Sequence, residues 1–253
     1  MAIGADWYLD HNLSECLFMA GFLKFAEGEF EEALKYFNGA GSLSRNISIL
    51  ESKDFPNALR RLRAACKQGY IIARPEEMAA LRSGERVRAL LGELYYVIEK
   101  LDDSIKVFQE LLDDPRSTAN AKAYALVGMG NVMMLRGAEG NIRGTALFER
   151  AFNEFPRSPS AAHAMLGHAY LASYAADYER NEEAFKLFKR CHDKYPNTHY
   201  GERALVQLLI NEYNRGEINA ARRHANAYRQ RYRNNGAFND LFVRYLNKIE
   251  EKE

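Results

Sequence analysis

Residues Ala20–Ala40 read AGFLKFAEGEFEEALKYFNGA, and this stretch decides the fold class. Helix-forming runs flank Gly28, which predicts two helices joined by a tight turn. Glycine suits that turn because it tolerates a positive φ angle. Small residues let two paired helices approach closely, and large aromatic side chains fill the space beside them. Residues of these two kinds occupy the packing positions Gly21, Phe30, Ala33, Phe37 and Ala40.

A related pattern recurs along the chain with a period of 40 residues. Phe108, Phe148 and Phe188 are 40 residues apart, and each follows a small residue (Ser104, Gly144, Ala184) by four positions. A proline (Pro115, Pro156, Pro196) comes seven or eight positions later, where it ends a helix. Each period is therefore predicted to contain two helices. The glycines predicted for close helix contacts are Gly21, Gly92, Gly130 and Gly167, and those predicted for turns are Gly28, Gly137 and Gly216.

These two-helix units resemble the tetratricopeptide repeat, a helix–turn–helix unit of about 34 residues. The resemblance rests on the packing positions of Ala20–Ala40 and on the spaced phenylalanines, and it covers about two-thirds of the chain. It implies an all-α fold, a right-handed α-solenoid of about five to six repeats in a single domain over residues 1–253. The predicted parts are repeats 14–47, 85–117, 118–157, 158–198 and 199–234, an irregular segment 42–84 and a capping helix 236–250.

The irregular segment and two insertions depart from the repeat pattern. Ala58 and Leu62 predict a helix, but its partner would have to be the short segment 43–51. Pro75, followed by two glutamates, predicts the start of another helix, because proline fits the first helical position and acids favour the first turn. Insertions at Gly137–Gly144 and Ser173–Glu182 are expected to lengthen a helix or to bulge the loop between helices.

Composition restricts the environment and the partners. With 35 Lys+Arg and 34 Asp+Glu, the net charge of +1 gives no general attraction to nucleic acid or to membrane surfaces. No run approaches the roughly 20 apolar residues of a membrane helix, so we expect no membrane insertion. Three distant cysteines (Cys16, Cys66, Cys191) favour a reducing compartment. The first residues show no basic leader ahead of an apolar run. We therefore expect a cytoplasmic protein, or a periplasmic one if a leader has been removed.

The sequence carries no recognised catalytic, metal-binding or cofactor-binding motif. Neither HExxH, GxxxxGK[ST] nor GxSxG occurs. Gly128-Met-Gly130 is only part of a dinucleotide-binding fingerprint, and it lies within a predicted helix rather than after a strand. Cys191 and His192 are adjacent rather than spaced for chelation. We therefore predict no catalytic residue, no metal site and no cofactor, and a protein that is not an enzyme.

The resemblance implies a binding surface instead. In tetratricopeptide solenoids the first helix of each repeat lines a concave groove, which suits an extended peptide or a partner helix. The predicted groove residues are Arg86, Glu93, Tyr96, Tyr124, Asn131, His168, Arg203 and Tyr213. We expect an interaction adaptor or assembly scaffold that binds a protein or peptide as part of a larger complex. The simpler alternative for Asn131 and His168 is that they are solvated or bond to neighbouring side chains.

Two other functions stay open. The segment Arg222–Arg233 interleaves arginines with tyrosines, a composition that can hold RNA through phosphate contacts and stacking. Its candidate nucleic-acid contacts are Arg222, Arg223, Arg229, Arg231 and Arg233. The near-neutral net charge favours a simpler interpretation, an amphipathic helix that packs Ala221, Ala225 and Tyr228 inward. The other function, a cell-envelope assembly factor of the tetratricopeptide type, is suggested only by the ending Phe188–Pro196 and the extended repeats.

Overall fold

The computed structural model describes residues 3–43, 54–67, 74–174, 178–233 and 236–251. Every regular element among these residues is a helix, which confirms the all-α prediction. The thirteen helices of this described part are α1 (Ile3–Ala26), α2 (Phe30–Leu43), α3 (Asp54–Lys67), α4 (Pro75–Ala79), α5 (Ser83–Val97), α6 (Leu101–Asp113), α7 (Ala119–Met134), α8 (Gly137–Glu154), α9 (Ser160–Ser173), α10 (Tyr178–Lys194), α11 (His199–Asn214), α12 (Ile218–Tyr232) and α13 (Asn239–Glu250). None of these helices combines the length and the apolar character that crossing a membrane requires.

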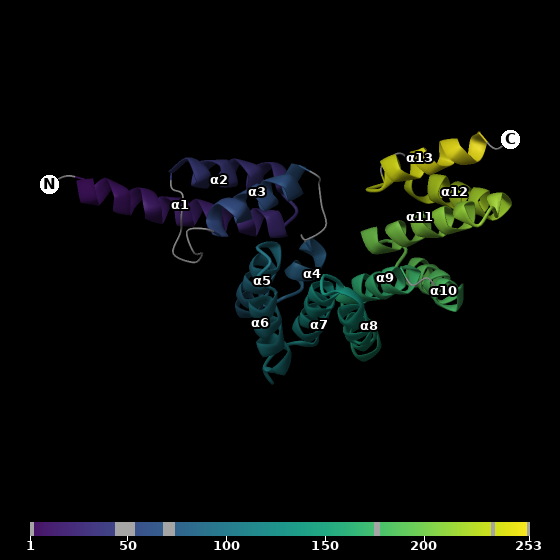
Figure 1. Cartoon of the computed structure of the whole chain (residues 1–253), viewed down its shortest axis with the longest axis horizontal. Helices are drawn as coiled ribbons and strands as arrows, with labels where there is room; N and C mark the ends of the chain where they lie inside the picture. Colours follow the sequence, from purple (N-terminus) through teal and green to yellow (C-terminus); the bar gives the residue numbers. More distant parts are fainter. Residues whose placement is uncertain (1–2, 44–53, 68–73, 175–177, 234–235, 252–253) are drawn as a thin grey trace. The chain divides into compact units, whose positions relative to one another are not determined.

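The chain folds into two compact units, Met1–Val132 and Met133–Glu253. Unit 1 contains α1 to α6 and nearly all of α7, and unit 2 contains α8 to α13 (Figure 1). In unit 1, α1 packs on α2, α2 on α3, and α5 on α6, while α5 also contacts α1 and α3. In unit 2, consecutive helices from α8 to α12 pack on one another, and α11 also contacts α9 and α13. Neighbouring helices are therefore packed in chain order within each unit.

Helix ends follow the local signals in the sequence. The helices α6, α8 and α10 end at Asp113, Glu154 and Lys194, each two residues before a proline. Thr198 caps α11, because its hydroxyl oxygen accepts a hydrogen bond from the backbone N–H of Gly201 at 3.1 Å. The turn predictions are confirmed by the positive φ angles of Gly28, Gly137 and Gly216, which are 81°, 73° and 79°.

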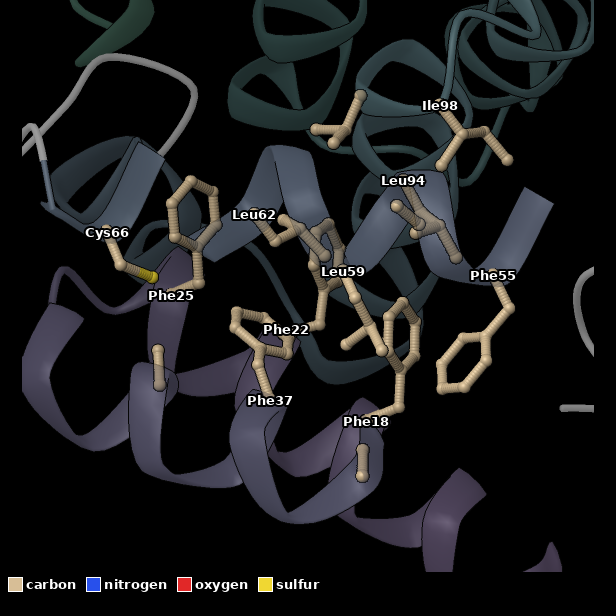
Figure 2. Packing of buried hydrophobic residues seen from close by; sticks show 14 residues of the cluster. Phe18, Phe22, Phe25, Phe37, Phe55, Leu59, Leu62, Cys66, Leu94 and Ile98 are labelled. Carbon is tan, nitrogen blue, oxygen red and sulfur yellow. The ribbon is translucent and has the colours of Figure 1, made fainter. Parts of the chain in front are cut away.

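The core of the N-terminal helices is aromatic. Figure 2 shows that α1, α2, α3 and α5 contribute side chains to one buried cluster. Phe18 is fully buried there, and its ring centroid lies 5.8 Å from that of Phe37 and 5.5 Å from that of Phe55. Tilted and edge-on aromatic pairs at this spacing are favourable beyond the apolar area that they bury. Burial of these rings joins α3, from the irregular segment 42–84, to the first helix pair.

Close contact between a glycine and a phenylalanine recurs in both units. A Cβ atom added to Gly92 would stand 2.7 Å from the Phe108 ring, and one added to Gly167 would stand 2.7 Å from the Phe148 ring. Gly92 therefore has the packing role predicted for it within repeat 85–117, whereas Gly167 of α9 meets Phe148 of α8, in the preceding predicted repeat 118–157. On α7, a Cβ atom added to Gly128 would stand 2.6 Å from the same Phe108 ring. Phe108 is thus held between α5 and α7.

The two insertions and the irregular segment 42–84 differ in the structure that they form. Gly137–Gly144 forms the start of α8, so this insertion lengthens a helix to 18 residues. The insertion at 173–182 runs from the last residue of α9 into α10, whose first residues, 178–182, belong to it, and its residues 175–177 lie outside the described part. The helix predicted at Pro75 is α4, with proline in its first turn, and the proposed partner segment 43–51 lies almost wholly outside the described residues.

The C-terminal helix predicted over 236–250 is present as α13. It packs against α11 and α12 and buries Phe242, Leu246 and Ile249 at helical spacing. The Phe242 ring stacks on that of Tyr228 of α12, with 4.2 Å between centroids. This aromatic stack attaches α13 to the helix before it.

Candidate binding surface

The eight predicted groove residues differ in their burial. Three are buried: Glu93, Tyr124 and His168. Five are partly exposed: Arg86, Tyr96, Asn131, Arg203 and Tyr213. Buried side chains do not meet a partner that docks on the surface, so only the second group is available for direct recognition. The residues up to Asn131 belong to unit 1, and the remaining three belong to unit 2.

In unit 1 the buried residues belong to a network centred on Arg74. The guanidinium lies 3.4 Å from the centroid of the Tyr124 ring. It donates to Glu77 Oε2 at 2.6 Å from Nη2 and to Glu93 Oε1 at 3.0 Å from Nη1. The Tyr124 hydroxyl donates to the same Glu93 oxygen at 2.9 Å. The Arg74 network therefore ties α4, α5 and α7 together with groups that have been removed from water.

The electrostatics of the Arg74 network also indicate a structural role. One guanidinium faces two carboxyl groups, and all three side chains are at most 7% exposed. Burial raises the pKa of Glu93, and the positive charge of Arg74 only partly opposes this effect. Burial also raises the pKa of Tyr124. A network of this kind stabilises one arrangement of helices, and it leaves no group open to a substrate.

The sequence reading missed Arg74 and Glu77 because they fall in the irregular segment 42–84. Arg74 comes just before α4, a position at which arginine is ordinarily solvated. Its partners Glu93 and Tyr124 are 19 and 50 residues away in the chain. No local pattern at Arg74 signals that it is buried.

The partly exposed groove residues of unit 1 have local roles. Arg86 donates from Nη2 to the backbone oxygen of Leu81 at 3.3 Å, across the turn between α4 and α5. Burial raises the pKa of Tyr96 to about 12, and the nearby Glu93 carboxyl acts in the same direction. Asn131 is half-buried on α7. No contact brings these three residues together as one site within the described part of the chain.

Unit 2 presents a more coherent polar surface. The Tyr170 hydroxyl on α9 accepts hydrogen bonds from Arg203 Nε at 2.6 Å and from Gln207 Nε2 at 3.1 Å, both on α11. These three half-buried residues are here called the Tyr170 cluster. The Arg203 guanidinium also lies 5.0 Å from the centroid of the Phe238 ring. Nearby along α11, the ring of Tyr213 packs edge-on against Tyr245 at 5.8 Å.

His168, also in unit 2, lies between acidic side chains. Its Nε2 atom is 3.5 Å from Glu183 Oε1 and 3.9 Å from Glu149 Oε1. The imidazole stacks on Phe152 with 6.1 Å between centroids and 15° between planes. The sequence reading selected His168 as a groove residue, but only the structure shows which acids from neighbouring helices face it.

The arginine-rich helix α12 buries Ala221, Ala225 and Tyr228, as the amphipathic interpretation predicts. Arg223, Arg229, Arg231 and Arg233 are exposed, and Arg222 is partly exposed. Two of these arginines bind other parts of unit 2. Arg229 pairs with Glu250 at 3.3 Å, and Arg231 donates to the Asn197 side chain at 2.8 Å.

Comparisons with known protein families and with curated proteins found no relative of this chain. The chain matches no model of a known protein family and no curated protein.

Proposed function

We propose that this chain is a non-enzymatic scaffold of the tetratricopeptide type, which binds a peptide segment or a partner subunit through the Tyr170 cluster of unit 2. The observation that carries the proposal is the way in which neighbouring side chains orient the Arg203 guanidinium. Its Nε atom is held by Tyr170, and its guanidinium lies near two aromatic rings. Its terminal nitrogens make no hydrogen bond within the described part of the chain, so a planar donor pair remains for a ligand.

The chemistry of this donor pair favours one kind of partner. An oriented guanidinium recognises a carboxylate by two parallel hydrogen bonds, so the bound segment carries an acidic side chain or a terminal carboxylate. Tyr170 and Gln207 add polar contacts beside it, and arginine and tyrosine are frequent anchors of interfaces. The packing of α9 against α11, and of α11 against α13, supports a binding surface made from the first helices of successive repeats.

The test uses partners captured from the native source and then purified, so that affinity can be measured directly. Arg203→Gln should weaken binding at least about tenfold, because it removes the charged donor pair. The control is Arg150→Gln on α8, where the arginine is 50% exposed and, among the described residues, pairs only with Glu154. If the Arg203→Gln variant binds the partner with the same affinity as the wild type, the Tyr170 cluster is not the binding site.

The second candidate function is RNA binding by α12. Arg223 and Arg233 favour it, because they are exposed and pair with no acid in the described part of the chain. The variant Arg223→Glu/Arg233→Glu should then abolish binding to single-stranded RNA, and the affinity of the wild type should fall steeply with salt. RNA binding that is unchanged in this variant, or that does not depend on salt, would exclude α12 as the contact.

A further inference from the structure

Three side chains of the kind that bind metal ions converge in unit 2, one from each of three consecutive helices. Glu149 belongs to α8, His168 to α9 and Glu183 to α10. One nitrogen or oxygen atom from each lies within 4.8 Å of the other two. These residues are here called the His168 triad.

The charges of the His168 triad are not balanced by a basic side chain. In the part of the chain that the structure describes, neither Glu149 nor Glu183 has a lysine or arginine within ion-pair distance. Most other partly exposed glutamates of unit 2 do have one, as in the pairs Arg150–Glu154 and Arg215–Glu182. Two carboxylates therefore approach one imidazole, an arrangement that a cation between them would stabilise.

The histidine is held in place while the acids remain accessible. His168 is 4% exposed, and its imidazole lies nearly parallel to the Phe152 ring, with 6.1 Å between the two centroids. The α8–α9 contact beneath it is close, because Gly167 lies directly against Phe148. The Glu149 and Glu183 side chains are each 48% exposed, so an ion can enter from solvent and keep water as further ligands.

The spacing and the ligand types select the class of ion. In a tetrahedral zinc site the ligand atoms are about 2.0–2.2 Å from the ion and hence about 3.4 Å from one another. The distances of 3.5 Å and 3.9 Å from His168 Nε2 are close to that value. An imidazole ligand favours transition metals, whereas Ca²⁺ and Mg²⁺ prefer oxygen ligands alone.

We propose that the His168 triad binds a divalent first-row transition metal ion, for which Zn²⁺ is the reference. The ion takes His168 Nε2 and one oxygen of each glutamate, and water fills the remaining positions. In this role the site links α8, α9 and α10 at the surface of unit 2. The proposal is independent of the Tyr170 cluster, because it uses none of the same side chains.

The test is a titration of the full chain, without an affinity tag, with Zn²⁺ followed by calorimetry and with Co²⁺ followed by its visible absorption. It is done in a Cys16→Ser background, because the Cys16 thiol is free, exposed and itself able to bind these metals. A single saturable site is expected. Glu149→Gln and Glu183→Gln should each weaken it at least about tenfold, because each removes a charged ligand.

The matched control is Glu154→Gln, on the same helix as Glu149 and with a similar side-chain exposure of 46%. It should bind the metal as the parent does. His168→Gln should also lose the site, and circular dichroism shows whether that variant keeps its helices.

Two results would overturn the proposal. The first is Co²⁺ absorption that persists in the variant Glu149→Gln/Glu183→Gln, which would place the metal elsewhere. The second is the absence of saturable binding in the parent chain, which would leave the His168 triad without a metal-binding role.

Discussion

The Arg74 network of unit 1 and the His168 triad of unit 2 contain similar side chains, but the first is buried and the second is open to solvent. In each, one basic side chain lies between two glutamates from neighbouring helical segments. In the Arg74 network the glutamates are 1% and 7% exposed, whereas in the His168 triad both are 48% exposed. The comparison teaches that solvent access decides what such a cluster can do.

The two clusters also differ in their basic residue, which is arginine in the first and histidine in the second. Arginine stays charged at any ordinary pH and uses its several donors at once, so Arg74 forms a closed network. Histidine offers a lone pair when neutral, so His168 can accept a proton or a metal ion. The first cluster therefore stabilises the fold, and the second is suited to binding.

The largest expected effect is the loss of Arg74. Arg74→Met leaves the buried Glu77 and Glu93 without their cation and should lower the free energy of unfolding by about 3–5 kcal/mol. Urea unfolding followed by circular dichroism measures this loss. The exposed control Arg150→Met should change stability by no more than about 0.5 kcal/mol. A loss below about 1 kcal/mol for Arg74→Met would contradict the structural role of the network.

Metal should affect only the second cluster. At a free Zn²⁺ concentration of about 100 times the dissociation constant, binding to the folded state should stabilise the chain by about 2.7 kcal/mol. In the Cys16→Ser background, the same measurement on Glu149→Gln/Glu183→Gln should show no gain, and a chelator should reverse the gain in the parent chain. Equal stabilisation of both proteins would show that the ion acts outside the His168 triad.

The glycine–phenylalanine contacts should behave alike in the two units. Gly92→Ala and Gly167→Ala each force a methyl group against a buried ring, and each should cost about 1–3 kcal/mol of stability. The control is Gly84→Ala in α5, where an added Cβ atom meets nothing within 4 Å. That variant should be neutral or slightly stabilised. A cost in only one unit would show that the two helix pairs are packed differently.

The smallest effect concerns the pH dependence of unit 1. Burial raises the pKa of Glu93 above its ordinary value of 4.5. The folded state then binds the Glu93 proton more tightly than the unfolded state does. The stabilisation that this proton gives the folded state is complete below pH 4.5 and is lost as the pH rises above the raised pKa. The stability of the wild type should therefore fall relative to Glu93→Gln as pH rises from 4 towards 8. A difference that does not change with pH would show that the pKa is not raised.

The helices were predictable because their signals are local. Pro75 begins α4, Pro115 follows the end of α6, and Gly28 and Gly216 adopt the turn conformations expected of them. Proline and glycine act through their own backbone geometry, so their effects do not depend on distant residues. The apolar spacing of the last helix was sufficient to predict α13 for the same reason.

The rotation of each helix was harder to predict, because it depends on packing. Gly128 of α7 lies against Phe108, a contact that the sequence pattern did not predict. The same uncertainty explains why Tyr124 and Glu93, expected in a groove, are buried against Arg74. A hydrophobic pattern says that a helix is buried on one side, but not which neighbour covers it.

The sequence by itself determined that this chain is helical, where the helices marked by proline and glycine begin or end, and that small and aromatic residues pack them. Only the tertiary structure decided that Arg74 meets Glu93 and Tyr124, and that Glu149 and Glu183 meet at His168. The physical reason is that helix formation is governed by neighbours along the chain. A binding cluster needs side chains from several helices, and only packing brings them together.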